Sequence, residues 1–355
     1  MFFYILLLFL IVALYVHRSL PLALAGIDKA STGQAWWERT DVYLIGTLCA
    51  ALIAFRALSV GIDTSTYALF YNQGIEQGIY LYSPNHQNME IGYNILQAIF
   101  IQLGLGFRAV LVFQALVCII PVCYVIIRYS TNPYFSFFVF IALDYFLFAM
   151  TGLRQSIAIG LTVLAFDAAL KHKRLHFLLL VGLAATFHIT ALIFLPVYLL
   201  VKIPDRKEVY ILAGIAFVLV YLTRGMLWEL AGRFARIAYE EGTISGTRML
   251  MLFILIVLSD FLLPRRAAVS RVHIALRHLT IVAIIMYPVL QFNPTAFRAH
   301  FFYTILLLLY VPGIVSGIRE RWLKLAVGSA YLAVMTLYML NYTFQNIGAI
   351  PYNFL

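Results

Sequence analysis

The run HFLLLVGLAATFHITALIFLPVYLLV (residues 176–201) decides how this chain is arranged in a membrane. It is long enough to form one tilted membrane-spanning helix. Basic segments flank it on both sides, with KHKR (171–174) before it and KIPDRK (202–207) after it. A single crossing would place one of these segments on the outer side, against the positive-inside rule. We therefore predict two short half-spans that meet at a hinge near His188, so that both basic segments stay on the inner side.

The rest of the chain has the composition of an integral membrane protein. Of its 355 residues, 63% are hydrophobic and only 11% are charged, and the mean hydropathy is +0.93. These values are far from those of soluble domains. The three cysteines lie in apolar runs without a second ligand at metal-binding spacing, which indicates neither a disulfide nor a metal cage. We predict a single integral-membrane domain over residues 1–355.

Apolar runs long enough to cross the membrane recur along the whole chain. Together with the hinged pair, they predict an all-α polytopic membrane protein with roughly 10–12 transmembrane helices in one bundle. The runs cover residues 2–16, 41–58, 108–127, 134–151, 154–170, 209–223, 247–263, 277–291, 300–317 and 323–341.

Two external segments are predicted to carry amphipathic helices that lie along the membrane surface. The first is EIGYNILQAIFIQLG (90–104), within an external loop at 59–107. Its polar residues recur at helical spacing opposite a row of isoleucines, and it is short for a span. The second is RGMLWELAGRFARIAYEEG (224–242), within an external loop at 224–246, with its large apolar residues on one face.

The distribution of basic residues supports this arrangement. Every lysine falls on the predicted inner side, and the inner loops hold about twice as many basic residues as the outer loops. The formal net charge of +10 is therefore mostly a topology signal and a means of binding anionic lipid headgroups. It does not indicate nucleic-acid binding.

The same arrangement gathers the unusual polar residues at the outer surface. Ionisable groups at membrane depth are costly and usually face a cavity or a partner. These residues are Asp63 and Tyr67 in GIDTSTY, Glu90 in NMEIGY, Arg154 in GLRQSIA, His188 in TFHITALIFLP, Arg298 in TAFRAHFFY, and the tail IPYNFL.

These motifs, in this order, resemble the EpsG family, which is often grouped with the Wzy-like polymerases of bacterial exopolysaccharide and O-antigen. The resemblance rests on GIDTSTY, MEIGYNIL, GLRQSIAIG, FHITALIFLP, FRAHFF and IPYNF, which together extend over nearly the whole chain. It implies a multi-helix fold like that of lipid-phosphate-sugar-dependent (GT-C-like) glycosyltransferases.

The resemblance also implies an activity. Lipid-linked oligosaccharide repeat units would be polymerised on the outer face of the bacterial inner membrane, with polyprenyl diphosphate as the leaving group. The implied partners are this polyprenyl-diphosphate-linked oligosaccharide and membrane lipids, with a chain-length regulator as a further candidate.

Such a reaction suggests roles for the outer polar residues. Arg154 and Arg298 are the candidates for stabilising the departing diphosphate, because a guanidinium donates two parallel hydrogen bonds to phosphate oxygens. The alternative for Arg154 is a helix-end arginine that reaches up to the headgroups. Asp63 or His188 could accept the proton of the attacking hydroxyl, and we prefer Asp63, as base or as acceptor-orienting group. The alternatives are a capping role for Asp63 and simple packing for His188.

Further residues are candidates for binding the substrate. Glu90 could instead favour a helix N-terminus, and the two arginines of the 224–246 loop could simply anchor headgroups. No metal or cofactor is predicted, because one outer carboxylate and the distant Glu90 make a poor cation site. The substrate-binding candidates are Tyr67, Glu90, Tyr93, Gln155, Arg233, Arg236, His300 and Tyr352.

Other classes of membrane protein remain open. A flippase for lipid-linked oligosaccharides would carry acids and cations through the whole bundle rather than at one side. A membrane O-acyltransferase would need a histidine in an inner cavity, and none of the inner histidines has a supporting motif. The sequence does not separate a polymerase from a ligase that moves finished glycan to another lipid.

Overall fold

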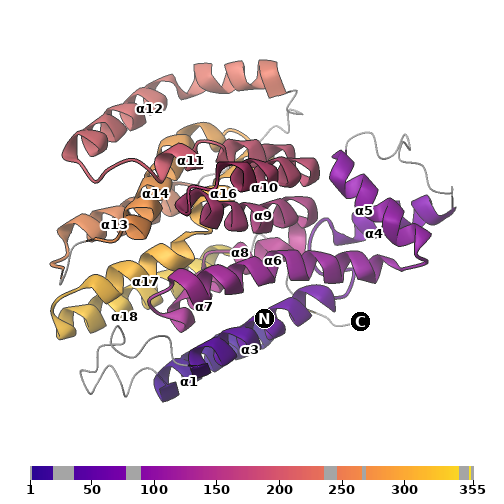
Figure 1. Cartoon of the computed structure of the whole chain (residues 1–355), viewed down its shortest axis with the longest axis horizontal. Coiled ribbons are helices and arrows are strands. Elements are labelled where there is room, and N and C mark those ends of the chain that lie inside the picture. Colours follow the sequence, from indigo (N-terminus) through magenta and orange to yellow (C-terminus); the bar gives the residue numbers. More distant parts are fainter. Residues whose placement is uncertain are drawn as a thin grey trace.

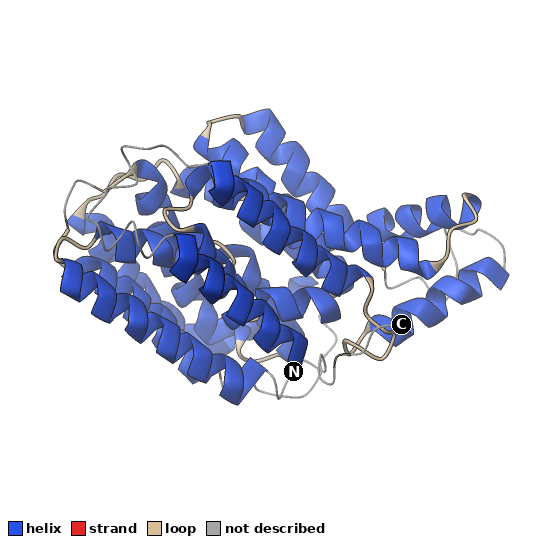
Figure 2. Ribbon diagram, turned by 90° about the horizontal axis from the view of Figure 1, so that it is seen from below, coloured by secondary structure: helices blue, strands red, loops and turns tan. Residues whose placement is uncertain are grey.

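The computed structural model of the chain describes residues 2–18, 36–76, 89–235, 246–265, 269–343 and Tyr352. These residues form helices and short connections (Figure 2), and extended pairing among them is limited to one isolated bridge between Arg265 and Ile318. Helices in the first half are α1 (Phe2–Arg18), α3 (Trp36–Ala54), α4 (Thr64–Glu76), α5 (Ile91–Gln102), α6 (Phe107–Tyr129), α7 (Pro133–Ala142), α8 (Tyr145–Thr151) and α9 (Leu153–Leu170). Those of the second half are α10 (Arg174–Phe187), the 3-10 helix η3 (Ile189–Phe194), α11 (Val197–Leu200), α12 (Lys207–Ala235), α13 (Thr247–Leu262), α14 (Arg271–Leu290), α15 (Pro294–Phe297), η4 (Arg298–His300), α16 (Phe301–Thr304), α17 (Leu307–Gly317), α18 (Arg321–Tyr338) and the π-helix η5 (Met339–Thr343).

Membrane-spanning helices are identified by their length and apolar composition. Among the described residues, α6, α9, α12, α14 and α18 are each long and apolar enough to cross. Two bent pairs raise the number from five to seven, since α7 and α8 meet at 49° and the segments Pro294–Thr304 and Leu307–Gly317 at 47°. The predicted all-α polytopic membrane protein is confirmed. The predicted count of roughly 10–12 spans is not reached on this criterion, because several predicted spans are short or broken helices.

The hinge predicted near His188 is confirmed. Helix α10 ends at Phe187, His188 is extended with φ −158°, and the chain continues as η3 and α11. It then runs back along α10, since the Tyr198 hydroxyl donates to the His172 carbonyl at 3.2 Å and the Phe177 and Tyr198 rings lie 5.4 Å apart. The two basic segments that flank this hairpin therefore lie at the same end of it.

The bundle has two chemically different ends. At one end, α4 and α5 lie beyond the ends of α9 and α10 and beside the end of α6 (Figure 1). Basic loops meet at the other end, where Asp167 pairs with Arg128 at 3.3 Å and with Lys171 at 2.6 Å. At the same end the Arg319 amide donates to the Pro264 carbonyl at 3.0 Å. Within the described residues, the loops predicted as inner and those predicted as outer are thus separated in space.

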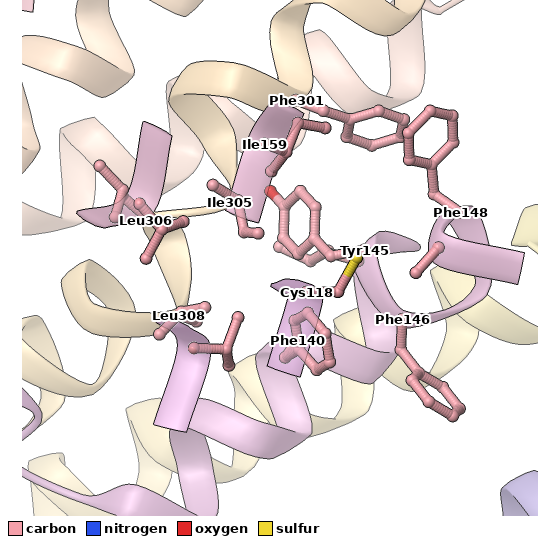
Figure 3. Close-up of a cluster of buried hydrophobic side chains, with 14 of the residues drawn as sticks. Cys118, Phe140, Tyr145, Phe146, Phe148, Ile159, Phe301, Ile305, Leu306 and Leu308 are labelled. Atoms are coloured by element: carbon pink, nitrogen blue, oxygen red, sulfur yellow. The ribbon is translucent and has the colours of Figure 1, made fainter. Parts of the chain in front are cut away.

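The centre of the bundle is built from α7, α8, α16 and α17. Figure 3 shows their aromatic and aliphatic side chains gathered in one cluster with Cys118 of α6 and Ile159 of α9. The Phe148 and Phe301 rings are 4.5 Å apart, and the Tyr145 and Phe301 rings 5.6 Å apart. The Tyr145 hydroxyl donates to the Thr304 carbonyl. A cavity of about 20 Å³ remains beside these rings, which is room for about one water molecule. This dense packing holds the turn between α8 and α9, which carries Arg154.

The two predicted surface helices have different outcomes. Helix α5 is present, with Ile91, Ile95 and Ile99 exposed and Tyr93 and Gln97 buried. Its position along the membrane surface stays a prediction.

The prediction of a separate helix at 224–242 is wrong in its start, because α12 continues without a break from Lys207 to Ala235. A helix of 29 residues is about 44 Å long, so its last turns extend past the hydrocarbon layer. Residues 236–245, which include Arg236, and the side chain of Arg233 lie outside the described parts of the chain.

Candidate functional site

An ion pair between Arg154 and Glu90 lies at the centre of the outer polar cluster. The Arg154 guanidinium donates through Nη1 to Glu90 Oε2 and through Nε to the Tyr67 hydroxyl, the latter at 2.8 Å. Its carbon atom Cζ lies 5.8 Å from the centroid of the Tyr67 ring. The three residues come from the first turn of α9, the residue before α5, and α4. Arg154 therefore joins three helices that are distant in the sequence.

The second oxygen of Glu90 binds the hinge of the α10 hairpin. Glu90 Oε1 lies 3.0 Å from His188 Nδ1 and accepts a hydrogen bond from the Ile189 amide at 3.2 Å. A carboxylate that binds Nδ1 orients the imidazole and favours the tautomer whose Nε2 can accept a proton. The pair thus has the geometry of an oriented general base.

The surroundings determine the charge of this cluster. Burial raises the pKa of Glu90, but the hydrogen bond from His188 and the charge of Arg154 lower it more, and the net pKa is below the ordinary value. Glu90 is therefore ionised at neutral pH. Burial raises the pKa of the Tyr67 hydroxyl, against the opposing effect of Arg154, so Tyr67 is protonated there.

A second, looser ion pair lies beside the first. Arg298 Nη1 and Asp63 Oδ2 are 3.9 Å apart, and each side chain is 35% exposed. The Gln155 side chain donates to the Arg298 carbonyl at 2.9 Å, so the residue next to Arg154 also fixes the backbone of Arg298. The two pairs are in this way parts of one site.

Close backbone contacts explain why these segments meet. Gly61 has φ +90°, and a Cβ there would lie 2.0 Å from the Met150 carbonyl oxygen, so the Asp63 loop packs directly on the end of α8. A Cβ on Gly92 would lie 2.3 Å from Thr186 Oγ1, so α5 packs directly on the end of α10. Only glycine allows both approaches without displacement.

The site therefore collects most of the predicted residues. Those brought together are Asp63, Tyr67, Glu90, Arg154, Gln155, His188 and Arg298. Tyr93 packs beneath them, with its ring 5.4 Å from that of Tyr67.

Two other predicted residues lie away from the site. His300 is fully buried, with Nδ1 2.6 Å from the Phe297 carbonyl oxygen, and is surrounded by aromatic rings. Tyr352 is buried against α1 and α3, where its hydroxyl donates to the Leu52 carbonyl at 2.7 Å. Their environments are those of packing residues, and we assign them no contact with substrate.

A buried polar group that the sequence motifs do not reveal lies beneath the site. It consists of Arg56, Thr64, Gln114 and Ser156, which are joined by hydrogen bonds. The available signal was the isolated Gln114 inside the apolar run 108–127, since an unaccompanied amide in a span requires a buried partner.

No group of three or more potential metal ligands occurs within the described ranges. Independence from metal ions stays a prediction.

Comparison with known proteins identifies the family. A family model described as the EpsG family matches residues 42–354. No curated protein and no solved structure matches the chain. The GT-C-like arrangement of the helices therefore stays a prediction.

Proposed function

The chain belongs to the EpsG family, and from this premise we propose that it polymerises polyprenyl-diphosphate-linked oligosaccharide repeat units. The family is associated with membrane proteins of the polysaccharide-polymerase type. The proposed reaction is transfer of a growing glycan to a hydroxyl of another lipid-linked unit. We place it on the outer face of the bacterial inner membrane, because the basic loops within the described residues lie at the opposite end of the bundle.

The observation that carries the proposal is the convergence of two cations, two carboxylates and a histidine at the predicted outer end of the bundle. Arg154, Glu90, His188, Arg298 and Asp63 come from five separate segments of the chain. Packing of an apolar bundle does not require such a group, and ionisable residues in membrane proteins usually mark a site.

His188 is the proposed general base. Glu90 holds its Nδ1, which leaves Nε2 to take the proton of the acceptor hydroxyl. The hydroxyl oxygen then forms a bond to the anomeric carbon, while the bond from that carbon to the diphosphate oxygen breaks. The diphosphate leaves with the bonding electron pair and requires cationic stabilisation.

Arg298 is the cation better placed to meet the diphosphate. Its pair with Asp63 is long, at 3.9 Å, and more exposed than the pair of Arg154 with Glu90. We therefore assign Arg298 to the leaving group and Asp63 to holding it or the acceptor. Arg154, in the first turn of α9, also stabilises the leaving group and fixes the position of Glu90.

The test is polymer formation by purified protein in lipid with its lipid-linked repeat unit. A ladder of products on a gel, with release of polyprenyl diphosphate, is expected. We expect His188→Gln to lower the rate by about 10²–10⁴-fold and chelation of metal ions to leave it unchanged. Transport of the repeat unit without chain growth would overturn the proposal in favour of a flippase. Transfer of one finished glycan to a different lipid would identify a ligase.

A further inference from the structure

Arg56 is the largest fully buried side chain of the described residues, with 0% exposure. Its guanidinium donates to the Ile53 carbonyl at 2.5 Å, to Thr64 Oγ1 from Nε and Nη2 at 3.4 Å, and to Gln114 Oε1 at 3.3 Å. Within the described ranges, all of these acceptors are neutral oxygens. Burying a cation costs several kcal/mol, so the arginine needs this network to remain there.

One arm of the network reaches the Asp63 loop. Thr64, which directly follows Asp63 and begins α4, accepts from Arg56. Its hydroxyl in turn donates to the Met150 carbonyl near the end of α8 at 3.2 Å. Arg56 therefore fixes where the Asp63 loop meets the α8–α9 turn.

The other arm reaches the turn that carries Arg154. The Gln114 amide nitrogen donates to Ser156 Oγ at 2.8 Å and to the Ala149 carbonyl. Ser156 donates to the Leu153 carbonyl at 2.9 Å. These contacts surround Arg154 on both sides in the sequence and hold the first turn of α9.

We propose that Arg56 is a positioning residue that sets the spacing between Asp63 and Arg154, and hence between the two ion pairs of the site. Its planar guanidinium donates in several directions at once, which the single ammonium of lysine cannot reproduce. The effect on rate rests on the proposed polymerase function. The effect on spacing does not.

The kinetic test compares kcat and KM of Arg56→Gln with those of a variant at a neighbouring arginine, Arg108. Because a displacement of about 1 Å can cost up to 10²-fold in rate, we expect kcat to fall by about 10–100-fold with little change in KM. Arg56→Lys should not restore it. Thr64→Val should lower kcat less and should be non-additive with Arg56→Gln, because both remove the same link.

Arg108→Gln is the matched control. Arg108 donates to the Ala54 and Arg56 carbonyls at 2.6 and 2.7 Å, so it stabilises the same helix end through backbone contacts. We expect this variant to lower the Tm and to leave kcat unchanged. Equal losses of kcat in Arg56→Gln and Arg108→Gln, or an unchanged kcat in Arg56→Gln, would overturn the proposal.

A distance measurement tests the spacing without the reaction. Spin labels on cysteines at the exposed positions Ser65 and Ile189 report the separation between the Asp63 loop and the His188 hinge, which Glu90 joins to Arg154. The native cysteines are buried, which protects them from labelling. We expect a broader distance distribution in Arg56→Gln, or in the milder Thr64→Val should the first not fold, and the wild-type distribution in Arg108→Gln. Unbroadened distributions in both network variants would refute the positioning role even if the protein makes no polymer.

Discussion

At the scale of single residues, the two outer arginines have different environments. The side chains of Arg154 and Glu90 are 21% and 18% exposed, and both members of the Arg298–Asp63 pair are 35% exposed. Arg154 is directed to Glu90 and Tyr67 rather than outward. The alternative of a helix-end arginine that reaches the lipid headgroups therefore does not fit it. Each cation is balanced by a carboxylate, which limits the cost of the site before substrate binds.

Arg154→Lys tests the two hydrogen bonds of the guanidinium, one to Glu90 and one to Tyr67. Lysine keeps the charge but cannot hold Glu90 and Tyr67 in one plane. Loss of one charge-assisted hydrogen bond costs about 1.5–3 kcal/mol, so we expect polymerisation to slow by about tenfold or more. Arg128→Lys is the control, since Arg128 lies at the opposite end of the bundle. Normal polymer from Arg154→Lys would show that charge alone is sufficient.

Glu90→Gln tests the ionised state of the carboxylate. Because the folded state lowers the pKa of Glu90, its ionic contribution is complete above the ordinary pKa and is lost as the pH falls through the lowered value. We expect the Tm difference between wild type and Glu90→Gln to persist undiminished down to about pH 5 and to shrink below about pH 4. A difference that already shrinks between pH 7 and 5 would contradict this order of titration.

At the scale of elements, the site depends on how α5 packs on the α10 hairpin. The polar face of α5 is turned toward the protein, and Ile91, Ile95 and Ile99 are exposed. Gly92 allows contact with Thr186, and Glu90, two residues earlier, binds both His188 and the Ile189 amide. The hinge therefore supplies both the histidine and the surface on which α5 packs.

Gly92→Ala should separate these two helices. The added Cβ would lie 2.7 Å from the Thr186 carbonyl oxygen, which cannot rotate away as a side chain can. We expect at least a tenfold loss of polymerisation. In Gly182→Ala, also a helix glycine, the Cβ meets nothing within 4 Å. We expect that variant to be active, and its free energy of unfolding to be about 0.5–1 kcal/mol higher than that of wild type. Comparable activity of the two variants would show that the α5 contact is dispensable.

At the scale of the whole molecule, the end opposite the site is held by a buried ionic cluster. The Asp260 carboxylate, with a fully buried side chain, binds Arg265, Arg277 Nε at 2.5 Å, His273 Nε2 at 2.8 Å and the Tyr310 hydroxyl at 2.7 Å. Arg277 also reaches Asp205 just before α12 at 3.1 Å. This cluster connects α13, α14, α17 and the start of α12.

Asp260→Asn should destabilise the whole bundle. Removing one partner of a buried ionic group typically costs about 3–5 kcal/mol, because the remaining charges stay buried. A clear drop in the Tm of the protein in detergent is expected. Glu320→Gln is the control, since the Arg319–Glu320 pair is exposed and 3.8 Å long, and exposed pairs contribute little. Similar Tm values for the two variants would mean that Asp260 is not a central contact.

Thiol labelling tests the topology. The contact between Tyr198 and His172 places both ends of the α10 hairpin together. Cysteines introduced at Lys173 and Lys202, both exposed, should therefore react from the same, cytoplasmic side of the membrane. Labelling from opposite sides would rule out the hairpin arrangement.

The sequence by itself determined the membrane class, the helical fold, the hinge at His188 and the separation of basic loops from the outer polar motifs. These follow from local properties, namely apolar run length and the placement of charges beside it. The sequence could not show that Glu90 pairs with both Arg154 and His188, because Glu90 lies 64 and 98 positions from them. Nor could it show the network of Arg56 beneath them.

Only the tertiary structure decided these partners. A buried ionisable group must find its counter-charge or hydrogen bonds wherever packing brings them, and packing is a property of the whole bundle. Here the close approaches at Gly61 and Gly92 place the loops, and the polar side chains pair as a result.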